Sequence, residues 1–174
     1  MRIYRGKVEP AALEILDRLI KENLVEVDPA EIDEARKDLE SVLLEYMRMH
    51  REINEAAKDM ADKRGLDYSA LGRIRRNLAK ERNFGMDDEG LDYIIEQMIE
   101  IMFSSGHVDE VWGEDHVLNK AIAPILKKHM NITEEVDKEV RKQIKNLEDA
   151  EGTVSWEVEY QQKKDKLERL KKLK

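Results

Sequence analysis

Apolar side chains recur three and four residues apart along most of the chain, a spacing that places them on one face of an α-helix. The longest regular run lies between residues 29 and 64, where the spacing alternates over four heptads without interruption. Its positions are Ile32, Ala35, Leu39, Val42, Tyr46, Met49, Ile53, Ala56 and Met60. The pattern predicts an all-α fold in which one long helix carries a coiled-coil seam.

Residues that favour helix ends flank this run. Asp28 and Pro29 precede it, and these residue types suit the N-cap and the first helical position. Lys63-Arg64-Gly65 follows it, with cations near the carbonyl end and a glycine that tolerates positive φ. A helix of about 36 residues spans about 54 Å, whereas a globule of this length is about 40 Å across. We therefore expect an elongated molecule.

The apolar pattern occurs twice, with an offset of 79 residues that grows to 83. The first stripe, Ala12, Ile15, Leu16, Leu19 and Ile20, corresponds to Leu91, Ile94, Ile95, Met98 and Ile99. The long seam corresponds to an apolar run that begins at Leu118 and ends at Ile144. Each copy reads as helix, loop, long helix, glycine and basic helix. We expect two tandem homologous units, residues 1–83 and residues 84–174.

The second long helix is less regular than the first. Pro124 lies where the helix interior is expected, so it removes one backbone donor and predicts a kink. Asn131-Ile132-Thr133-Glu134 has the residue types of a capping box, which indicates a possible break near Asn131.

Two stretches resemble a known family. The opening MRIYRGKVEP is followed by an amphipathic helix and the turn Val25-Glu26-Val27, and the segment EGTVSWEVEY lies near the C-terminus. The residues of that segment that carry the resemblance are Glu151, Gly152, Trp156 and Tyr160. Together they resemble the bacterial domain-of-unknown-function family five-zero-seven, present as two tandem copies. The resemblance implies a bacterial, intracellular, helical protein, and it supplies no reaction, ligand or catalytic residue.

The amino-acid composition excludes several classes of functional site. The 174 residues are 40% charged and 41% hydrophobic, with a net charge of -8 and no cysteine, so disulfides, thiolate metal sites and thiol nucleophiles are excluded. The longest apolar cluster, residues 94–103, is too short and too charged to span a bilayer, and the N-terminus lacks a signal-peptide core. We expect a cytoplasmic protein.

The loop of residues 107–116 contains two histidines and four carboxylates, which are ligand types for Zn, Mn or Fe. His107, Asp109 and His116 are weak metal candidates. The alternative is an acidic loop that leads into a helix, because no tight ligand spacing is present. We expect no metal and no other cofactor.

Catalytic signals are equally weak. Tyr46 and His129 occupy equivalent positions on the two long seams, but no activating partner is visible, so packing is the simpler interpretation. The chain contains no hydrolase elbow, phosphate loop or dinucleotide fingerprint. We expect no catalytic residue and no small-molecule substrate.

Two basic segments, residues 63–82 and residues 163–174, contrast with an otherwise acidic chain. They could fold back on the acidic helices, lie on an anionic membrane, or bind the phosphates of a nucleic acid. The phosphate-binding candidates are Arg73, Arg75, Arg76, Lys80, Arg82, Lys163, Lys164, Lys166 and Arg169. We also expect deletion of residues 163–174 to leave the rest folded.

The leading hypothesis is a non-enzymatic helical interaction or scaffold protein. It would self-associate, or bind another protein, through the long seam, because an exposed stripe of four heptads is large for a monomer. The alternative hypothesis is a nucleic-acid-associated protein that binds the phosphate backbone through the two basic segments.

Overall fold

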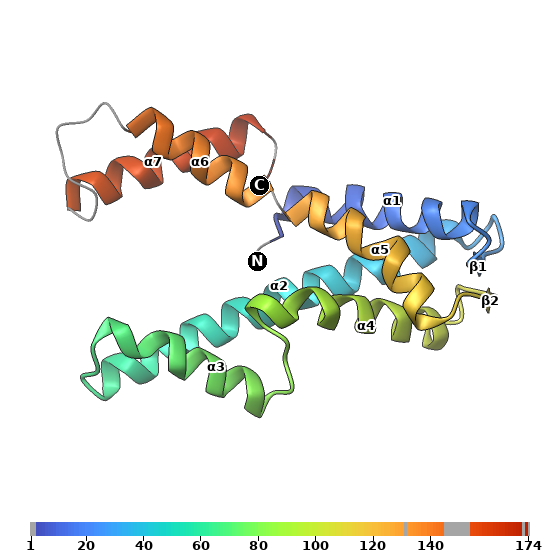
Figure 1. Ribbon diagram of the computed structural model, residues 1–174, viewed down its shortest axis with the longest axis horizontal. Helices are drawn as coiled ribbons and strands as arrows, with labels where there is room; N and C mark the ends of the chain where they lie inside the picture. Colours follow the sequence, from blue (N-terminus) through green and yellow to red (C-terminus); the bar gives the residue numbers. More distant parts are fainter. Residues whose placement is uncertain (1–2, 131, 145–153, 172, 174) are drawn as a thin grey trace.

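A computed structural model describes residues 3–130, 132–144, 154–171 and 173 as a forked helical molecule (Figure 1). The elements are α1 (Val8–Lys21), β1 (Val25–Glu26), α2 (Ile32–Lys63), α3 (Leu71–Glu81), α4 (Gly90–Ser104), β2 (Glu110–Val111), α5 (Asp115–Met130), α6 (Ile132–Ile144) and α7 (Val154–Leu170). The predicted all-α class is confirmed, apart from the short strand pair. None of the described helices combines the length and apolar character that crossing a membrane requires.

Four helices form the body of the fork. α1 contacts α2 and α5, and α4 contacts the same two helices, so a continuous core lies between them (Figure 1). The apolar stripes of α1 and α4 face this core, where Leu16 and Ile94 are fully buried. At one end of the body, β1 and β2 pair antiparallel, with Val25 opposite Val111. The strand pair ties together the two loops that enter α2 and α5.

Most of the predicted seam of α2 is covered by helices of the same chain. Ala35, Leu39, Tyr46 and Ile53 are buried. α1 and α4 pack against α2, and α3 also packs against it. The other five seam positions are half-buried, so the stripe is not the large exposed surface expected from the sequence, and self-association through it stays a prediction.

The ends of α2 differ slightly from the prediction of one helix over residues 29–64. Asp28 Oδ1 accepts a hydrogen bond from Ala30 N at 2.8 Å, and Glu31 N donates to Asp28 O at 2.8 Å. Asp28 thus caps a turn, and the regular helix begins at Ile32. Gly65 has φ +57°, which confirms the predicted stop. The helix between these ends is continuous.

Two helical hairpins extend from the body at the end away from the strands (Figure 1). Prong 1 is the C-terminal half of α2 with α3, and prong 2 is α6 with α7. Prong 2 has a small core of its own, which is separate from the core of the body. Its buried residues are Tyr4, Val136, Val140, Ile144 and Leu173.

The N-terminal segment joins the two cores. Ile3 is buried in the core of the body, whereas the adjacent Tyr4 is buried in prong 2. Tyr4 Oη donates a hydrogen bond of 2.9 Å to the buried Glu168 carboxylate. Gly6 N donates to Leu173 O at 3.1 Å. Within residues 163–174, Glu168 and Leu173 therefore belong to prong 2, so we now expect the deletion to unfold this prong.

Two further predictions concern the second long helix, which is formed by α5 and α6. α5 continues past Pro124 to Met130. The predicted break at Asn131 lies outside the described residues.

The predicted units, residues 1–83 and 84–174, share the core of the body, since α1 packs on α5 and α2 packs on α4. Their relation as repeats stays a prediction.

We expect Leu173→Ala to destabilise prong 2 and leave the body intact. Leu173 is 1% exposed, and truncation of a buried Leu costs about 2–5 kcal/mol. Hydrogen exchange should accelerate in α6 and α7 but not in α1, α2, α4 and α5. Leu170→Ala is the matched control, because Leu170 is 72% exposed and its truncation should cost less than about 0.5 kcal/mol. Equal exchange in the two variants would contradict the assignment of Leu173 to the prong 2 core.

Candidate functional site

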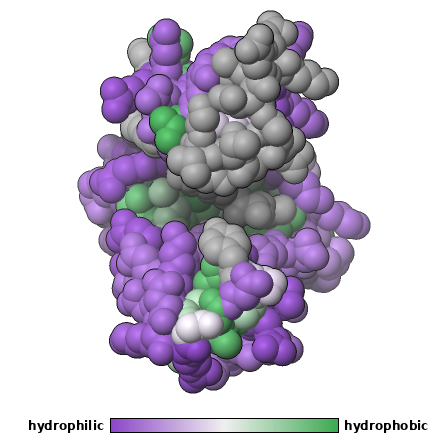
Figure 2. Space-filling model, turned by 90° about the vertical axis from the view of Figure 1, so that its left-hand side faces the viewer, coloured by the Kyte–Doolittle hydropathy of each residue, from purple (hydrophilic) through white to green (hydrophobic). Residues whose placement is uncertain are grey.

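The candidate site is a cleft between α2 and the N-terminal segment. It has a volume of about 690 Å³. Its lining includes Ile3, Arg5, Leu44, Met47, Arg51 and Lys58. Figure 2, which views the prong end of the molecule, shows hydrophobic side chains recessed among hydrophilic ones between its upper and lower parts. We call this site the cationic cleft.

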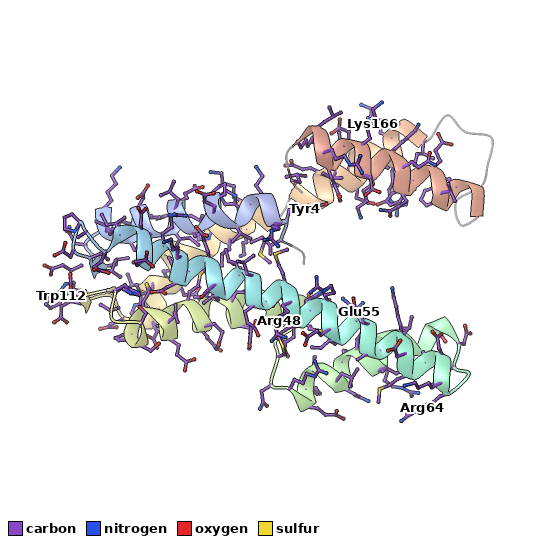
Figure 3. The ribbon with its side chains drawn as sticks, turned by 180° about the vertical axis from the view of Figure 1, so that it is seen from behind. Tyr4, Arg48, Glu55, Arg64, Trp112 and Lys166 are labelled. Atoms are coloured by element: carbon purple, nitrogen blue, oxygen red, sulfur yellow. The ribbon has the colours of Figure 1, made fainter. Side chains whose placement is uncertain are left out.

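One face of α2 forms most of the cleft. Leu44, Arg51 and Lys58 are spaced seven residues apart, and Met47 and Glu55 lie between them on the same face. At 100° per residue, this face lies about a third of a turn around the helix from the buried stripe. α2 can therefore pack its apolar stripe inside the molecule and still present a second stripe to the cleft. Figure 3 shows Glu55 and Arg48, which also line the cleft, on α2.

The lining of the cleft has an excess of positive charge, since Glu55 is its one carboxylate beside four cations. Within the described part of the chain, no ion pair is found for Arg5, Arg51 or Lys58. Arg48 differs, because Glu45 and Glu52 bind its guanidinium. Unpaired cations beside a low-dielectric wall concentrate anions near them. The cleft therefore offers a positive potential together with apolar contact area.

The wall of the cleft supplies that apolar area. Leu44 is 38% exposed, and Met47 is half-buried. Ile3 also lines the cleft, but it is only 2% exposed, so Leu44 and Met47 supply nearly all of the apolar area. A bound group that carries only charge would leave these surfaces in water. An amphipathic group would cover them and contribute hydrophobic free energy of about 25 cal/mol per Å².

The predicted phosphate-binding residues of α3 lie on prong 1, outside the lining of the cleft. Two of the five basic side chains are paired: Arg75 with Asp87 at 3.2 Å, and Arg82 with Glu52 at 3.7 Å. The remaining three are exposed and have no ion pair among the described residues: Arg73, Arg76 and Lys80.

The corresponding residues of α7 lie on prong 2. Lys163 pairs with Glu159 at 3.3 Å, and Lys164 Nζ lies 5.7 Å from the centre of the Tyr160 ring. Lys166 and Arg169 are exposed, with no ion pair in the described ranges; Figure 3 marks Lys166 on this prong. The two basic segments are therefore carried by different prongs, and part of their charge is neutralised locally.

The weak metal candidates do not form a cluster. His107 Nδ1 lies 2.8 Å from Asp38 Oδ2, and His116 Nδ1 lies 3.3 Å from Glu114. In the described portion, no three His, Cys, Asp or Glu side chains are placed to hold one metal ion. Asp109 is exposed, and its backbone N–H donates to Glu26 O. The His107–Asp38 pair is thus a contact between the loop and α2.

Tyr46 and His129 are buried, in keeping with their place on the two seams. The Tyr46 ring packs 5.0 Å from the Phe84 ring, and burial raises the pKa of Tyr46 to about 12. His129 Nε2 lies 2.8 Å from a Glu14 carboxylate oxygen. The contacts of both rings are those of interior packing between helices.

Sequence reasoning missed the cationic cleft. Its cations are spread along a helix that also carries many acidic residues, so no basic run is visible. The signal that could have found it is the seven-residue spacing of Leu44, Arg51 and Lys58 beside the buried seam. Arg5 could not have been placed, because its position depends on the packing of the N-terminal segment.

Comparison with known families gives one finding. A family model described as "protein of unknown function (DUF507)" matches residues 1–172 as a single copy. The match thus supports the resemblance inferred from the sequence, but it does not divide the chain into two tandem copies. A search of curated proteins gave no match.

We expect the His107–Asp38 contact to make stability depend on pH. Its hydrogen bond with Asp38 raises the pKa of His107 above the ordinary 6.5. The contact therefore stabilises the fold fully below the unfolded pKa and loses its effect as pH rises through the folded pKa. NMR titration should show that the His107 pKa falls in Asp38→Asn. An unchanged His107 pKa in that variant would contradict the assignment.

Proposed function

The chain belongs to the DUF507 family, and we propose that it is a non-enzymatic helical interaction protein whose cationic cleft binds an acidic amphipathic segment of a protein. One observation carries this proposal: the cleft combines the cations Arg5, Arg51 and Lys58, which have no ion pair among the described residues, with the apolar wall of Leu44 and Met47. A bound segment with carboxylates on one side and apolar side chains on the other satisfies both parts of this lining.

A helix is one form of segment that fits the cleft. The stripe of α2 that lines it runs from Leu44 to Lys58, which corresponds to about 21 Å of helix. A partner helix of about four turns would follow this length. Helices that bind in grooves use apolar anchors three, four and seven residues apart, which is also the spacing of the cleft residues.

A second candidate function is nucleic-acid binding through the prongs. It is supported by the five exposed cations with no ion pair among the described residues: Arg73, Arg76, Lys80, Lys166 and Arg169. Such cations displace counterions from a phosphate backbone. The net charge of -8 opposes this function, since the rest of the molecule repels a polyanion.

We further propose that residues 1–83 and 84–174 are duplicated units. The first half contains α1, β1, α2 and α3, and the second half repeats this order as α4, β2, α5–α6 and α7. The contacts support the proposal, because exchange of the halves converts the α1–α5 contact into the α4–α2 contact. A cytoplasmic location, in keeping with the intracellular character that the family resemblance implies, is part of the same proposal.

The cleft is tested by reversal of its charge. We expect Arg51→Glu with Lys58→Glu to weaken binding of a designed amphipathic peptide, with Glu on one face and Leu on the other, by about tenfold or more. Fluorescence anisotropy at low salt measures the affinity. Arg73→Glu with Arg76→Glu is the matched control, because it makes the same charge change on exposed residues of α3.

The binding results of the two double variants distinguish the two candidate functions. Equal weakening of the peptide by both double variants would contradict the cleft. Tight binding of duplex DNA that falls steeply with salt, and that only the α3 variant weakens, would favour the nucleic-acid function.

A further inference from the structure

The end of the body that carries the strands is strongly acidic. Residues 22–34 contain six carboxylates and residues 104–116 contain four, and neither segment contains Lys or Arg. Pairing of β1 with β2 holds the two segments together at the end away from the prongs (Figure 1). We call these residues the acidic tip. The two ends of the molecule therefore differ in charge. The acidic tip lies at one end, and the prongs and the cationic cleft lie toward the other.

Some of this charge has no counterpart within the molecule. Arg18 and Lys37 neutralise Glu22 and Glu34 by ion pairs. By contrast, no ion pair is found among the described residues for four exposed carboxylates: Glu26, Asp28, Asp109 and Glu110. The tip therefore has negative charge available to an external cation.

The strand pair places like charges opposite one another. Glu26 and Glu110 are register partners in the antiparallel pair. Like charges at directly opposite positions destabilise such a pair. A guanidinium or ammonium group supplied from outside would remove this repulsion, so the tip would be stabilised when it is bound to a cationic surface.

An aromatic anchor lies within the tip. Trp112 is 64% exposed, and Figure 3 shows it at the end of the molecule remote from the prongs. Its backbone N–H donates to Leu24 O at 2.9 Å, and Gly113 N donates to the same oxygen at 3.0 Å. These bonds fix the backbone that carries the indole. Glu110 and Glu114 flank Trp112 in the sequence, and Trp is enriched among the residues that anchor protein interfaces.

We propose that the acidic tip of one copy of this chain binds in the cationic cleft of a second copy. The inference rests on the proposed function, because it names the occupant of the same cleft. Carboxylates of the tip meet Arg5, Arg51 and Lys58, and Trp112 packs on the apolar wall at Leu44. This contact differs from self-association through the seam, since the seam is covered within the chain.

The contact joins two different surfaces, so it is head-to-tail. A pair keeps one free tip on one copy and one free cleft on the other, so association continues to open chains unless the geometry closes a ring. Because the attraction is between charges at the surface, it weakens as salt shortens the screening length. Assemblies should therefore form at low salt and high protein concentration.

Sedimentation velocity of the full chain tests this proposal. The wild type should form species larger than dimers at low salt and return toward monomer at about 0.5 M salt. Trp112→Ala blocks the tip, and Arg51→Glu with Lys58→Glu blocks the cleft. Each variant alone should be monomeric. A mixture of the two should give a 1:1 dimer and nothing larger, because only one intact tip and one intact cleft can meet.

Controls make the outcome decisive. Phe103→Ala removes an aromatic side chain that is also 64% exposed but lies on α4, and it should associate like the wild type. If Trp112→Ala loses its helical circular dichroism, Glu26→Gln with Glu110→Gln replaces it as the tip variant, since it removes charge from the tip without creating a match for the reversed cleft. A wild type that stays monomeric at low salt, or variants that fail to pair when mixed, would overturn the proposal. If the designed acidic peptide still binds the cleft in that case, the proposed function stands and only the occupant is wrong.

Discussion

The organisation of the molecule depends on α2, one unbroken helix that packs against other helices with one face and lines the cleft with another. α2 buries one stripe against α1 and α4 in the body and against α3 in prong 1, while the neighbouring stripe lines the cleft. Its 32 residues pass from one part of the molecule to the other without a break. A break near the middle would separate Leu44 from Lys58 and remove the cleft. The continuity of α2 therefore couples the packing of the core to the geometry of the site.

The N-terminal segment is the second constraint. Adjacent residues enter different cores, Ile3 the core of the body and Tyr4 that of prong 2, and Arg5 lines the cleft. The same short segment thus sets the position of prong 2 and completes the opposite wall of the site. This arrangement also gives a structural role to the described residues of the basic segment 163–174. Although they read as a basic arm, Glu168 and Leu173 anchor the arm to the N-terminus.

Local patterns predicted the helices better than they predicted the contacts between them. The heptad run of α2 and the stop at Gly65 follow from residue spacing and backbone preference, and the structure confirms both. Whether the seam faces solvent or another helix depends on contacts between distant segments, so the sequence could not decide it. The hydrogen bond between Tyr4 and Glu168 joins residues 164 positions apart. The cleft was missed for the same reason, since Arg5 meets α2 only after folding.

The function proposed here depends on positive charge and apolar surface being presented together in the cleft, and chemical-shift mapping tests this most directly. Backbone amide NMR of the full chain, titrated at low salt with the designed acidic amphipathic peptide, would locate the bound segment. The account predicts shifts concentrated at Arg5 and along α2 between residues 44 and 58. Shifts confined to α3 and α7, with the residues of the cleft unchanged, would contradict it.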